Sequence, residues 1–238
     1  MHFTELPTPA LTIDLDALER NLDHMAKMCR DQGVGLRPHI KTHKTPELAR
    51  MQVERGAVGL TAAKVGEAEV MVGAGLDDIL VAFPIFGEEK LRRLAALAKA
   101  RRVLLSLDDE ATAKELSQAA SGQGATVGVL VEFDAGFHRC GLRPGPDLVA
   151  LAKRIQALPG LRFRGLMTYF GNVWGPREDR QREARQVAGE VAKAHAAFGS
   201  SASSCSTILR ISIWQLRPAN TCLTTLRSSL RDWGTGLL

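Results

Sequence analysis

The stretch GLRPHIK, residues 35–41, decides between two α/β architectures, because it joins a strand-like pattern to a row of basic side chains. Side chains along a strand point alternately to opposite faces, so Arg37, His39 and Lys41 are expected to share one face. A polar row that ends where a strand ends is typical of the carboxyl-terminal face of a (β/α)8 barrel. The simpler interpretation is a structural core histidine followed by a surface lysine.

Upstream and downstream of this stretch, to about residue 199, short apolar runs alternate with helical patterns. This alternation predicts a parallel sheet with crossover helices, either an open doubly wound sheet or a barrel. No G-x-G-x-x-G follows a predicted strand, which counts against a dinucleotide-binding sheet and favours the barrel. Asp16 is the expected cap of the first helix. The predicted strands are 11–15, 35–40, 57–63, 78–83, 102–107, 126–133 and 162–170. The predicted helices are 16–31, 65–74, 87–100, 109–120, 147–157 and 177–198.

The composition is that of an ordinary globular protein, with 45% hydrophobic and 24% charged residues and a net charge of +5. Basic residues are dispersed among acidic ones, so nucleic acid is not an expected partner. No apolar run approaches the roughly 18 residues of a membrane span, so no membrane partner is expected either. The four cysteines show no metal-ligand or disulfide spacing and the start shows no signal-peptide pattern, which together favour a cytoplasmic location.

Two further predicted strands also end in polar residues. VEFDAGFHRCG (131–141) places Arg139 in a glycine-flanked loop, and GLMTYFGN (165–172) contains Tyr169, the single tyrosine of the chain. The carboxyl ends of parallel strands meet at one face of a barrel, so these clusters and Lys41 predict a single site.

Lys41 is the candidate reagent of this site. A lysine becomes nucleophilic at neutral pH when desolvation or neighbouring cations lower its pKa, and Arg37, His39 and His43 are close in sequence. Such a lysine forms Schiff bases with carbonyl compounds, and pyridoxal phosphate is the commonest cofactor held in this way. Arg139 is suited to hold the phenolate of that cofactor, or a carboxylate, through charge-assisted hydrogen bonds.

Five blocks resemble, in order and spacing, the D-threonine aldolase and D-serine dehydratase family: TPALTIDLDALERN, LRPHIKTHKTPELARMQ, GLTAAKVGEAEVMVGAGLDDILVAFP, VEFDAGFHRCG and GLMTYFGN. Members of this family are fold-type III pyridoxal phosphate enzymes related to alanine racemase. The resemblance implies a (β/α)8 TIM barrel of alanine-racemase type. It further implies that Lys41 carries the cofactor, that Arg139 lies near the phenolic oxygen and that Tyr169 flanks cofactor or substrate. His39 is implied only as a supporting catalytic residue.

The activity implied by the resemblance is lyase chemistry on D-3-hydroxy amino acids. The expected reaction is D-threonine aldolase-like, a retro-aldol cleavage to glycine and an aldehyde through a Schiff base on Lys41. D-serine or 3-hydroxyaspartate dehydratase and amino-acid racemase stay open as alternatives, because no single residue separates them. The family also implies a divalent metal beside the β-hydroxyl, and homodimers for full-length relatives.

Residues 200–238 read as an atypical tail, in which 13 of 39 residues are Ser or Thr and Asp232 is the single acid. The glycine-rich phosphate loop and the His/Cys metal pair of the family are not recognisable there, so no metal ligand is assigned. We therefore expect a cofactor-binding barrel domain at 1–199, incomplete at its carboxyl end, with the tail in place of the last barrel strands and the C-terminal β-domain. A frameshift near residue 199 is the hypothesis for the tail, and an inactive truncated cofactor-binding fragment is the non-enzymatic alternative.

Overall fold

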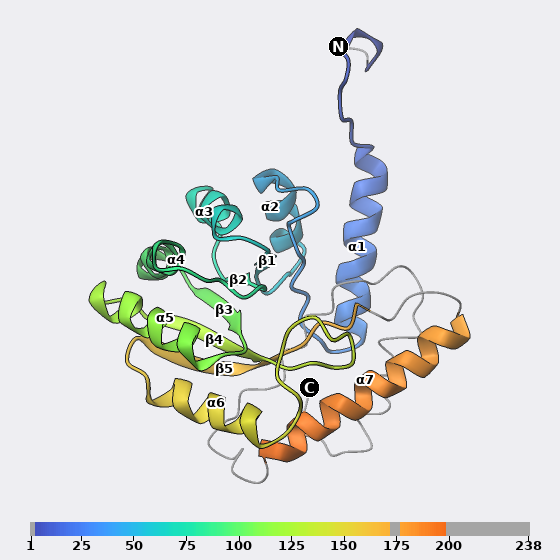
Figure 1. Ribbon diagram of the computed structural model, residues 1–238. Helices are drawn as coiled ribbons and strands as arrows, with labels where there is room; N and C mark the ends of the chain where they lie inside the picture. Colours follow the sequence, from blue (N-terminus) through green and yellow to red (C-terminus); the bar gives the residue numbers. More distant parts are fainter. Residues whose placement is uncertain (1–2, 172–176, 199–238) are drawn as a thin grey trace.

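A parallel sheet of five strands forms the centre of the protein, whose computed structural model describes residues 3–171 and 177–198 (Figure 1). The strands are β1 (Leu60–Ala62), β2 (Ile79–Val81), β3 (Val103–Leu107), β4 (Val127–Glu132) and β5 (Leu161–Met167). They pair in chain order, and every pairing is parallel. This is the arrangement of successive βα units in a barrel wall. The predicted α/β class is confirmed, and in the described residues the wall is open, with β1 and β5 at its edges.

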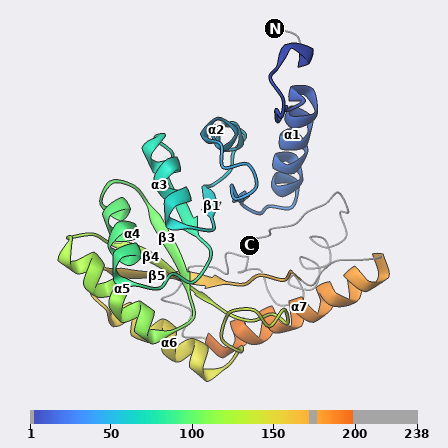
Figure 2. The same cartoon turned by 45° about the horizontal axis from the view of Figure 1, so that its top comes forward.

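Helices come before the first strand and after each strand, and the four helices between successive strands lie along the outer side of the sheet (Figures 1 and 2). The helices described are the 3-10 helix η1 (Phe3–Glu5) and the α-helices α1 (Leu15–Asp31), α2 (Pro46–Glu54), α3 (Val65–Gly73), α4 (Glu88–Ala100), α5 (Glu110–Gly122), α6 (Pro146–Ala157) and α7 (Arg177–Phe198). The six predicted helices are confirmed, with bounds that differ by at most two residues. Among the helices described, none combines the length and the apolar character that a membrane crossing requires.

Alternate side chains of the strands enter two separate cores. The larger core packs one face of the sheet against the helices, and it includes Leu105 and Val129. The smaller core is a single layer on the opposite, inner face, made by Leu80, Leu104, Leu130 and Met167. Full burial of such a side chain contributes about 1.5–3 kcal/mol, so the inner layer holds neighbouring strands together.

The extended segment 36–40 runs parallel to β1 at the edge of the sheet. It exchanges three backbone hydrogen bonds of 2.8 Å with Val58 and Thr61. Pro38 has no N–H to donate, so the pairing is that of an isolated bridge instead of a full ladder. The strand predicted for this stretch is therefore present only in irregular form, and it delivers the next residues to the carboxyl end of the sheet.

The prediction of a strand at 11–15 is wrong. Residues 11–14 have no strand partner among the residues described, Leu15 already belongs to a helix, and Leu11 is 97% exposed. The first helix begins at Leu15 and is capped by Asp14, not Asp16: Asp14 Oδ1 accepts a 2.9 Å hydrogen bond from the N–H of Ala17. An extended cap residue places its carboxylate over the free N–H groups of the first turn, and only Asp14 has that conformation. Figure 1 shows this helix reaching away from the sheet.

Candidate active site

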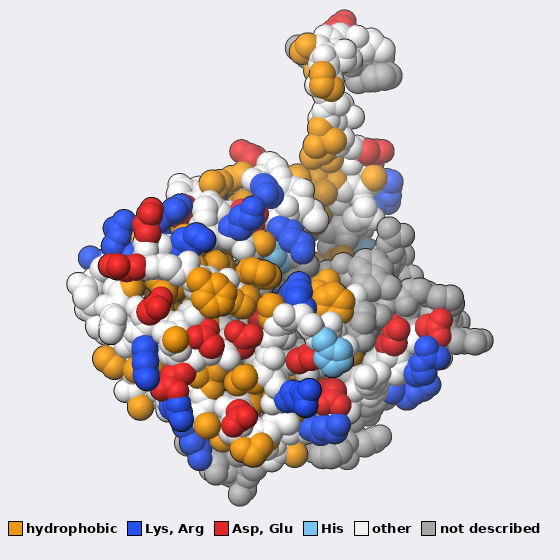
Figure 3. Space-filling model, viewed as in Figure 1, with side chains coloured by type: hydrophobic (Ala, Val, Ile, Leu, Met, Phe, Trp, Pro, Cys, Tyr) orange, Lys and Arg blue, Asp and Glu red, His pale blue; other side chains and the backbone are white. Residues whose placement is uncertain are grey.

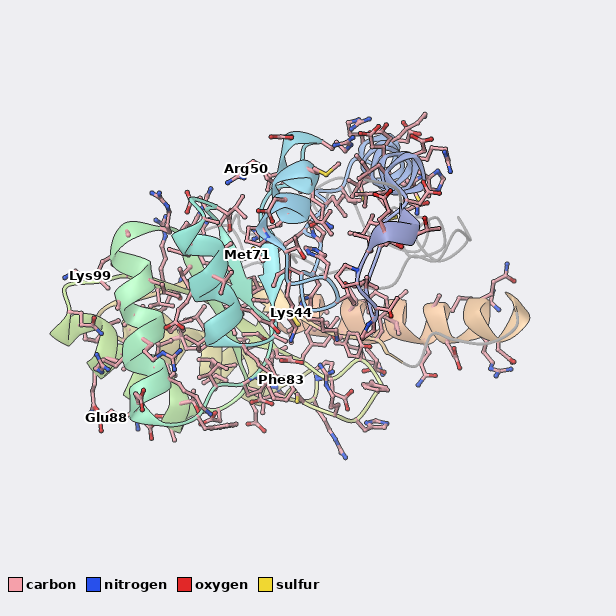
Figure 4. All side chains as sticks on the ribbon, turned by 90° about the horizontal axis from the view of Figure 1, so that it is seen from above. Lys44, Arg50, Met71, Phe83, Glu88 and Lys99 are labelled. Carbon is pink, nitrogen blue, oxygen red and sulfur yellow. The ribbon has the colours of Figure 1, made fainter. Side chains whose placement is uncertain are left out.

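A cleft opens at the carboxyl end of the sheet. It is lined by residues from the segment beside β1, from the ends of β1, β2 and β5, and from the loop after β4: His39, Lys41, Ala63, Ala82, Phe83, Arg139, Met167, Thr168 and Tyr169. All four predicted site residues are in this set. Figure 3 shows hydrophobic side chains gathered in the middle of one face with basic side chains beside them. In Figure 4, Phe83 and Lys44 lie near the middle of the molecule, whereas Glu88 and Lys99 of α4 lie at its outer side.

The basic side chains around Lys41 are distributed between the two ends of the sheet. Arg37 lies at the amino end, where its guanidinium donates to the Oδ1 and the backbone oxygen of Asp78 at 2.7 and 2.6 Å. Both side chains of this ion pair are about one-tenth exposed, at 9% and 10%. Lys44 Nζ lies 3.2 Å from Glu67 Oε1. Arg37 and Lys44 are thus each compensated by an acid, and neither lines the cleft.

Lys41 follows the irregular edge segment in a turn, where its side chain reaches the mouth of the cleft and is exposed. Its backbone N–H donates to His39 Nδ1 at 3.1 Å, which fixes the orientation of the imidazole. Burial lowers the pKa of His39, and the charges of Lys41 and His43 lower it further. His39 is therefore neutral at physiological pH, and because its Nδ1 accepts a hydrogen bond, its proton is on Nε2.

The loop after β4 is held in place by two carboxylates. Asp134 Oδ1 accepts hydrogen bonds of 2.9 Å from the backbone N–H groups two and four residues later. Asp108, just past β3, accepts a 2.7 Å hydrogen bond from the N–H of Gly141 at the other end of the loop. Because both ends of the loop are fixed, the Arg139 side chain is directed to the cleft.

Three aromatic rings surround the guanidinium of Arg139. Its central carbon lies 4.4 Å from the ring centroid of Tyr169, and 5.7 and 5.8 Å from those of Phe83 and Phe137. Phe137 meets Tyr169 edge to face, with centroids 5.3 Å apart. Cation–π contacts leave the N–H groups of an arginine available to a ligand, and Arg139 forms no ion pair with any residue in the described part of the chain.

The inner wall of the cleft contains polar groups that the sequence pattern does not predict as site residues. Thr168, in the cleft, and Thr61, on β1, are fully buried, and neither hydroxyl has a hydrogen-bond partner among the residues described. An unpaired buried hydroxyl costs about 1–3 kcal/mol, so these groups suit a polar ligand. The feature of the sequence that could have identified Thr168 is its position next to Tyr169, at the end of a strand.

Glu132, at the end of β4, is a further unpredicted polar residue, buried on the inner face of the sheet. Its Oε2 accepts a 2.9 Å hydrogen bond from the hydroxyl of Ser106 on β3. Burial raises the pKa of Glu132 to about 7, although Ser106 and Arg139 oppose the rise. A charged residue inside the apolar run 126–133 is the sequence signal that could have identified it.

The family model of the alanine racemase N-terminal domain matches residues 13–218. The chain belongs to this family. A D-threonine aldolase of Arthrobacter sp is 38% identical over 203 residues, which are 84% of this chain and 54% of that protein. A D-threo-3-hydroxyaspartate dehydratase of Delftia sp. (strain HT23) is 33% identical over 171 residues, 71% of this chain and 45% of that protein. The crystal structure of D-threonine aldolase from Filomicrobium marinum is 42% identical, with a TM-score of 0.80 over 82% of this chain and 53% of that chain.

These relatives confirm the predicted membership of the alanine racemase N-terminal domain family and its fold class. The chain spans about half the length of the relatives that it matches. Between residues 3 and 171 and in α7, no group of three or more His, Cys, Asp and Glu side chains is arranged to hold a metal ion. The predicted boundary at 199 and the tail 200–238 lie outside the described residues, so the domain division stays a prediction.

Proposed function

We propose that this chain carries the cofactor site of a pyridoxal-phosphate-dependent lyase that acts on D-3-hydroxy amino acids. The reaction proposed is that of a D-threonine aldolase, which cleaves the Cα–Cβ bond to give glycine and an aldehyde. The observation that carries the proposal is the meeting of Lys41, Arg139 and Tyr169 in one cleft of a chain 38% identical to a D-threonine aldolase.

The functional groups of the cleft fit this cofactor. They comprise a primary amine, a guanidinium, an aromatic face and a buried hydroxyl without a partner in the described part of the chain. In the proposed roles, Lys41 would hold the aldehyde group, Arg139 would bind the phenolic oxygen, Tyr169 would contact the cofactor or the substrate, and Thr168 would bind a polar substituent. When bound, pyridoxal phosphate draws electron density from the bonds at Cα of an amino acid, which is the chemistry that cleavage needs.

His39 has a supporting role in this proposal. Its Nδ1 accepts the backbone N–H of Lys41, so a neutral imidazole holds the turn from which the lysine reaches the cleft. Protonation would turn this acceptor into a donor facing an N–H group, and burial lowers the pKa of His39, which prevents it. We therefore propose His39 as a positioning residue for the amine and not as a proton donor.

The first test is formation of the lysine-bound cofactor. Purified protein mixed with pyridoxal phosphate is expected to develop absorbance at about 420 nm, which Lys41→Ala abolishes. Lys90→Ala, which changes an exposed lysine on α4, is the matched control and should retain it. Borohydride reduction followed by peptide mass spectrometry should place the cofactor on Lys41. Absence of the band from the wild type, or a label on another lysine, would contradict the assignment.

The second test separates the two lyase reactions. With D-threonine, an aldolase releases glycine and acetaldehyde, whereas a dehydratase releases 2-oxobutyrate and ammonia. Dehydration is the second candidate because the chain is also 33% identical to a D-threo-3-hydroxyaspartate dehydratase. Product analysis by chromatography distinguishes them, and 2-oxobutyrate without glycine would reverse the order of the two candidates.

A further inference from the structure

Glu132 is a buried carboxyl group that the proposed cofactor chemistry leaves without a role. It is 1% exposed and lies on the inner face of the sheet, two residues after Leu130 of the inner core. The hydroxyl of Ser106 donates to its Oε2 at 2.9 Å. Its backbone oxygen also accepts the N–H of Leu142 at 3.1 Å, so Glu132 closes the base of the loop that carries Arg139.

The charges that face Glu132 come from two elements. Asp108 follows β3, and Asp134 and Arg139 belong to the loop after β4. Burial is the main cause that raises the pKa of Glu132, the hydrogen bond from Ser106 and the charge of Arg139 lower it, and the two aspartates raise it slightly. Burial raises the pKa of the Cys140 thiol, next to Arg139, and the charge of Glu132 raises it further.

We propose that Glu132 is a positioning residue that controls how strongly Arg139 binds an anionic ligand group. An ionised Glu132 attracts the guanidinium and repels an incoming anion, whereas a protonated Glu132 leaves the full positive charge of Arg139 to the ligand. Anion binding at Arg139 and proton binding at Glu132 therefore favour each other, by thermodynamic reciprocity. The inference deepens the proposed function, in that the anion would be an oxygen of the cofactor or of an amino acid.

This coupling of anion binding at Arg139 to proton binding at Glu132 should occur near neutral pH, because the pKa of Glu132 is raised to about 7. A bound anion weakens the positive charge of Arg139, which stabilises the ionised carboxyl group, so binding should be accompanied by proton uptake. Affinity for an anion should accordingly fall as pH rises through this range, and it should fall less when residue 132 cannot ionise.

The decisive experiment needs no ligand. Protein labelled with 13C at the glutamate carboxyl carbon is titrated by NMR, with the Glu132 signal assigned by its absence from Glu132→Gln. We expect a midpoint near 7 in the wild type and a higher midpoint in Arg139→Gln, because a stabilising positive charge is lost. Arg143→Gln, which removes an exposed arginine just past the loop, is the control and should leave the midpoint unchanged. An ordinary carboxyl midpoint, or one that Arg139→Gln does not raise, overturns the proposal.

A second measurement extends the test to the cofactor. The ratio of pyridoxal phosphate affinities of wild type and Glu132→Gln, from equilibrium dialysis, should change about five-fold or more between roughly pH 6 and pH 8. A ratio that is constant with pH overturns the linkage. Failure of every variant to bind pyridoxal phosphate would overturn the proposed function, while the ligand-free titration would still decide the role of Glu132.

Discussion

Arg139 and Tyr169 form a stacked pair across the cleft, with the guanidinium carbon 4.4 Å from the centroid of the phenol ring. Arg139 comes from the loop after β4, and Tyr169 lies just past the end of β5. Phe137, from the same loop as the arginine, meets the edge of the tyrosine ring at 5.3 Å. The ring of Tyr169 is therefore the surface onto which the arginine loop docks, and its removal should affect the arginine more than the sheet.

Replacing Tyr169 by Leu should weaken binding of pyridoxal phosphate about ten-fold. The exposed cation–π contact is worth about 0.5–1 kcal/mol and the aromatic pair about 0.5–1.5 kcal/mol, and both are lost. Tyr169→Phe keeps the ring and should change affinity by less than about three-fold, because only the hydroxyl is removed. Equilibrium dialysis measures both variants. Equal losses would show that the hydroxyl, and not the ring, is what binding requires.

Gly171→Ala should displace the Tyr169 ring without altering the cleft composition. A Cβ at Gly171 would lie 2.4 Å from Tyr169 Cε1, closer than two carbon atoms can approach, so the ring must move. The chain has a single tyrosine, so 13C-tyrosine labelling yields one set of ring signals, and these should shift. In Gly189→Ala, on α7, the new Cβ meets nothing within 4 Å. That control should keep the wild-type signals and gain about 0.5–1 kcal/mol of helix stability. Unshifted ring signals in Gly171→Ala would refute the close approach.

Local patterns were sufficient to predict six of the seven α-helices described and most strands, because burial along each element depends on its own periodicity; α2 (Pro46–Glu54) was not among them. The strand predicted at 11–15 shows the limit of that approach. Apolar alternation at Leu11 and Ile13 indicates a strand with one buried face, yet no strand in the described chain lies beside it and both side chains are exposed. Whether a strand forms depends on a partner elsewhere in the chain, and no local pattern specifies that partner.

The site was predictable to the extent that its residues are polar and end a strand. Lys41, Arg139 and Tyr169 satisfy that condition, and the structure gathers them in one cleft. Arg37 shares their pattern, but its partner Asp78 is distant in sequence and draws it to the amino end of the sheet. Glu132 was not predicted for a related reason. It lies inside an apolar run, and whether its side chain points inward depends on the register of β4 against β3.

Asp78→Asn should destabilise the protein substantially, because it removes the carboxylate that pairs with the buried Arg37 and also with Arg102. The Arg37–Asp78 side chains are 9% and 10% exposed, and loss of one member of a buried pair costs about 3–5 kcal/mol. Asn tolerates the positive φ of 56° at this position, so the backbone is not the cause of the loss. Asp31→Asn breaks the exposed pair with Lys27 and should cost less than about 1 kcal/mol. Urea unfolding compares the two variants, and similar small losses would mean that the Arg37 pair is not structural.

Glu132 should also make the stability of the protein depend on pH, independently of any ligand. Its pKa is about 7 in the folded protein against 4.5 for an unperturbed glutamate, so the folded state binds this proton more tightly than the unfolded state does. The stabilising contribution is fully present below pH 4.5 and is lost as pH rises through about 7. Glu132→Gln can still accept the hydrogen bond from Ser106 but cannot ionise, so it should become more stable relative to wild type by up to about 3 kcal/mol over this interval.

His39 also makes the stability of the protein depend on pH, with the opposite sign, but this effect cancels when wild type is compared with Glu132→Gln. Burial lowers the pKa of His39 below its usual 6.5, so its contribution to stability is lost as pH falls below that value, when the unfolded chain takes up the proton. This loss occurs in both proteins and cancels in the difference between wild type and Glu132→Gln. Urea unfolding at about pH 4.5, 6 and 8 measures, at each pH, the difference in free energy of unfolding between wild type and Glu132→Gln. A difference in free energy of unfolding that stays constant with pH would mean that Glu132 titrates alike in the folded and unfolded chains. Its carboxyl group would then be open to water in the folded protein.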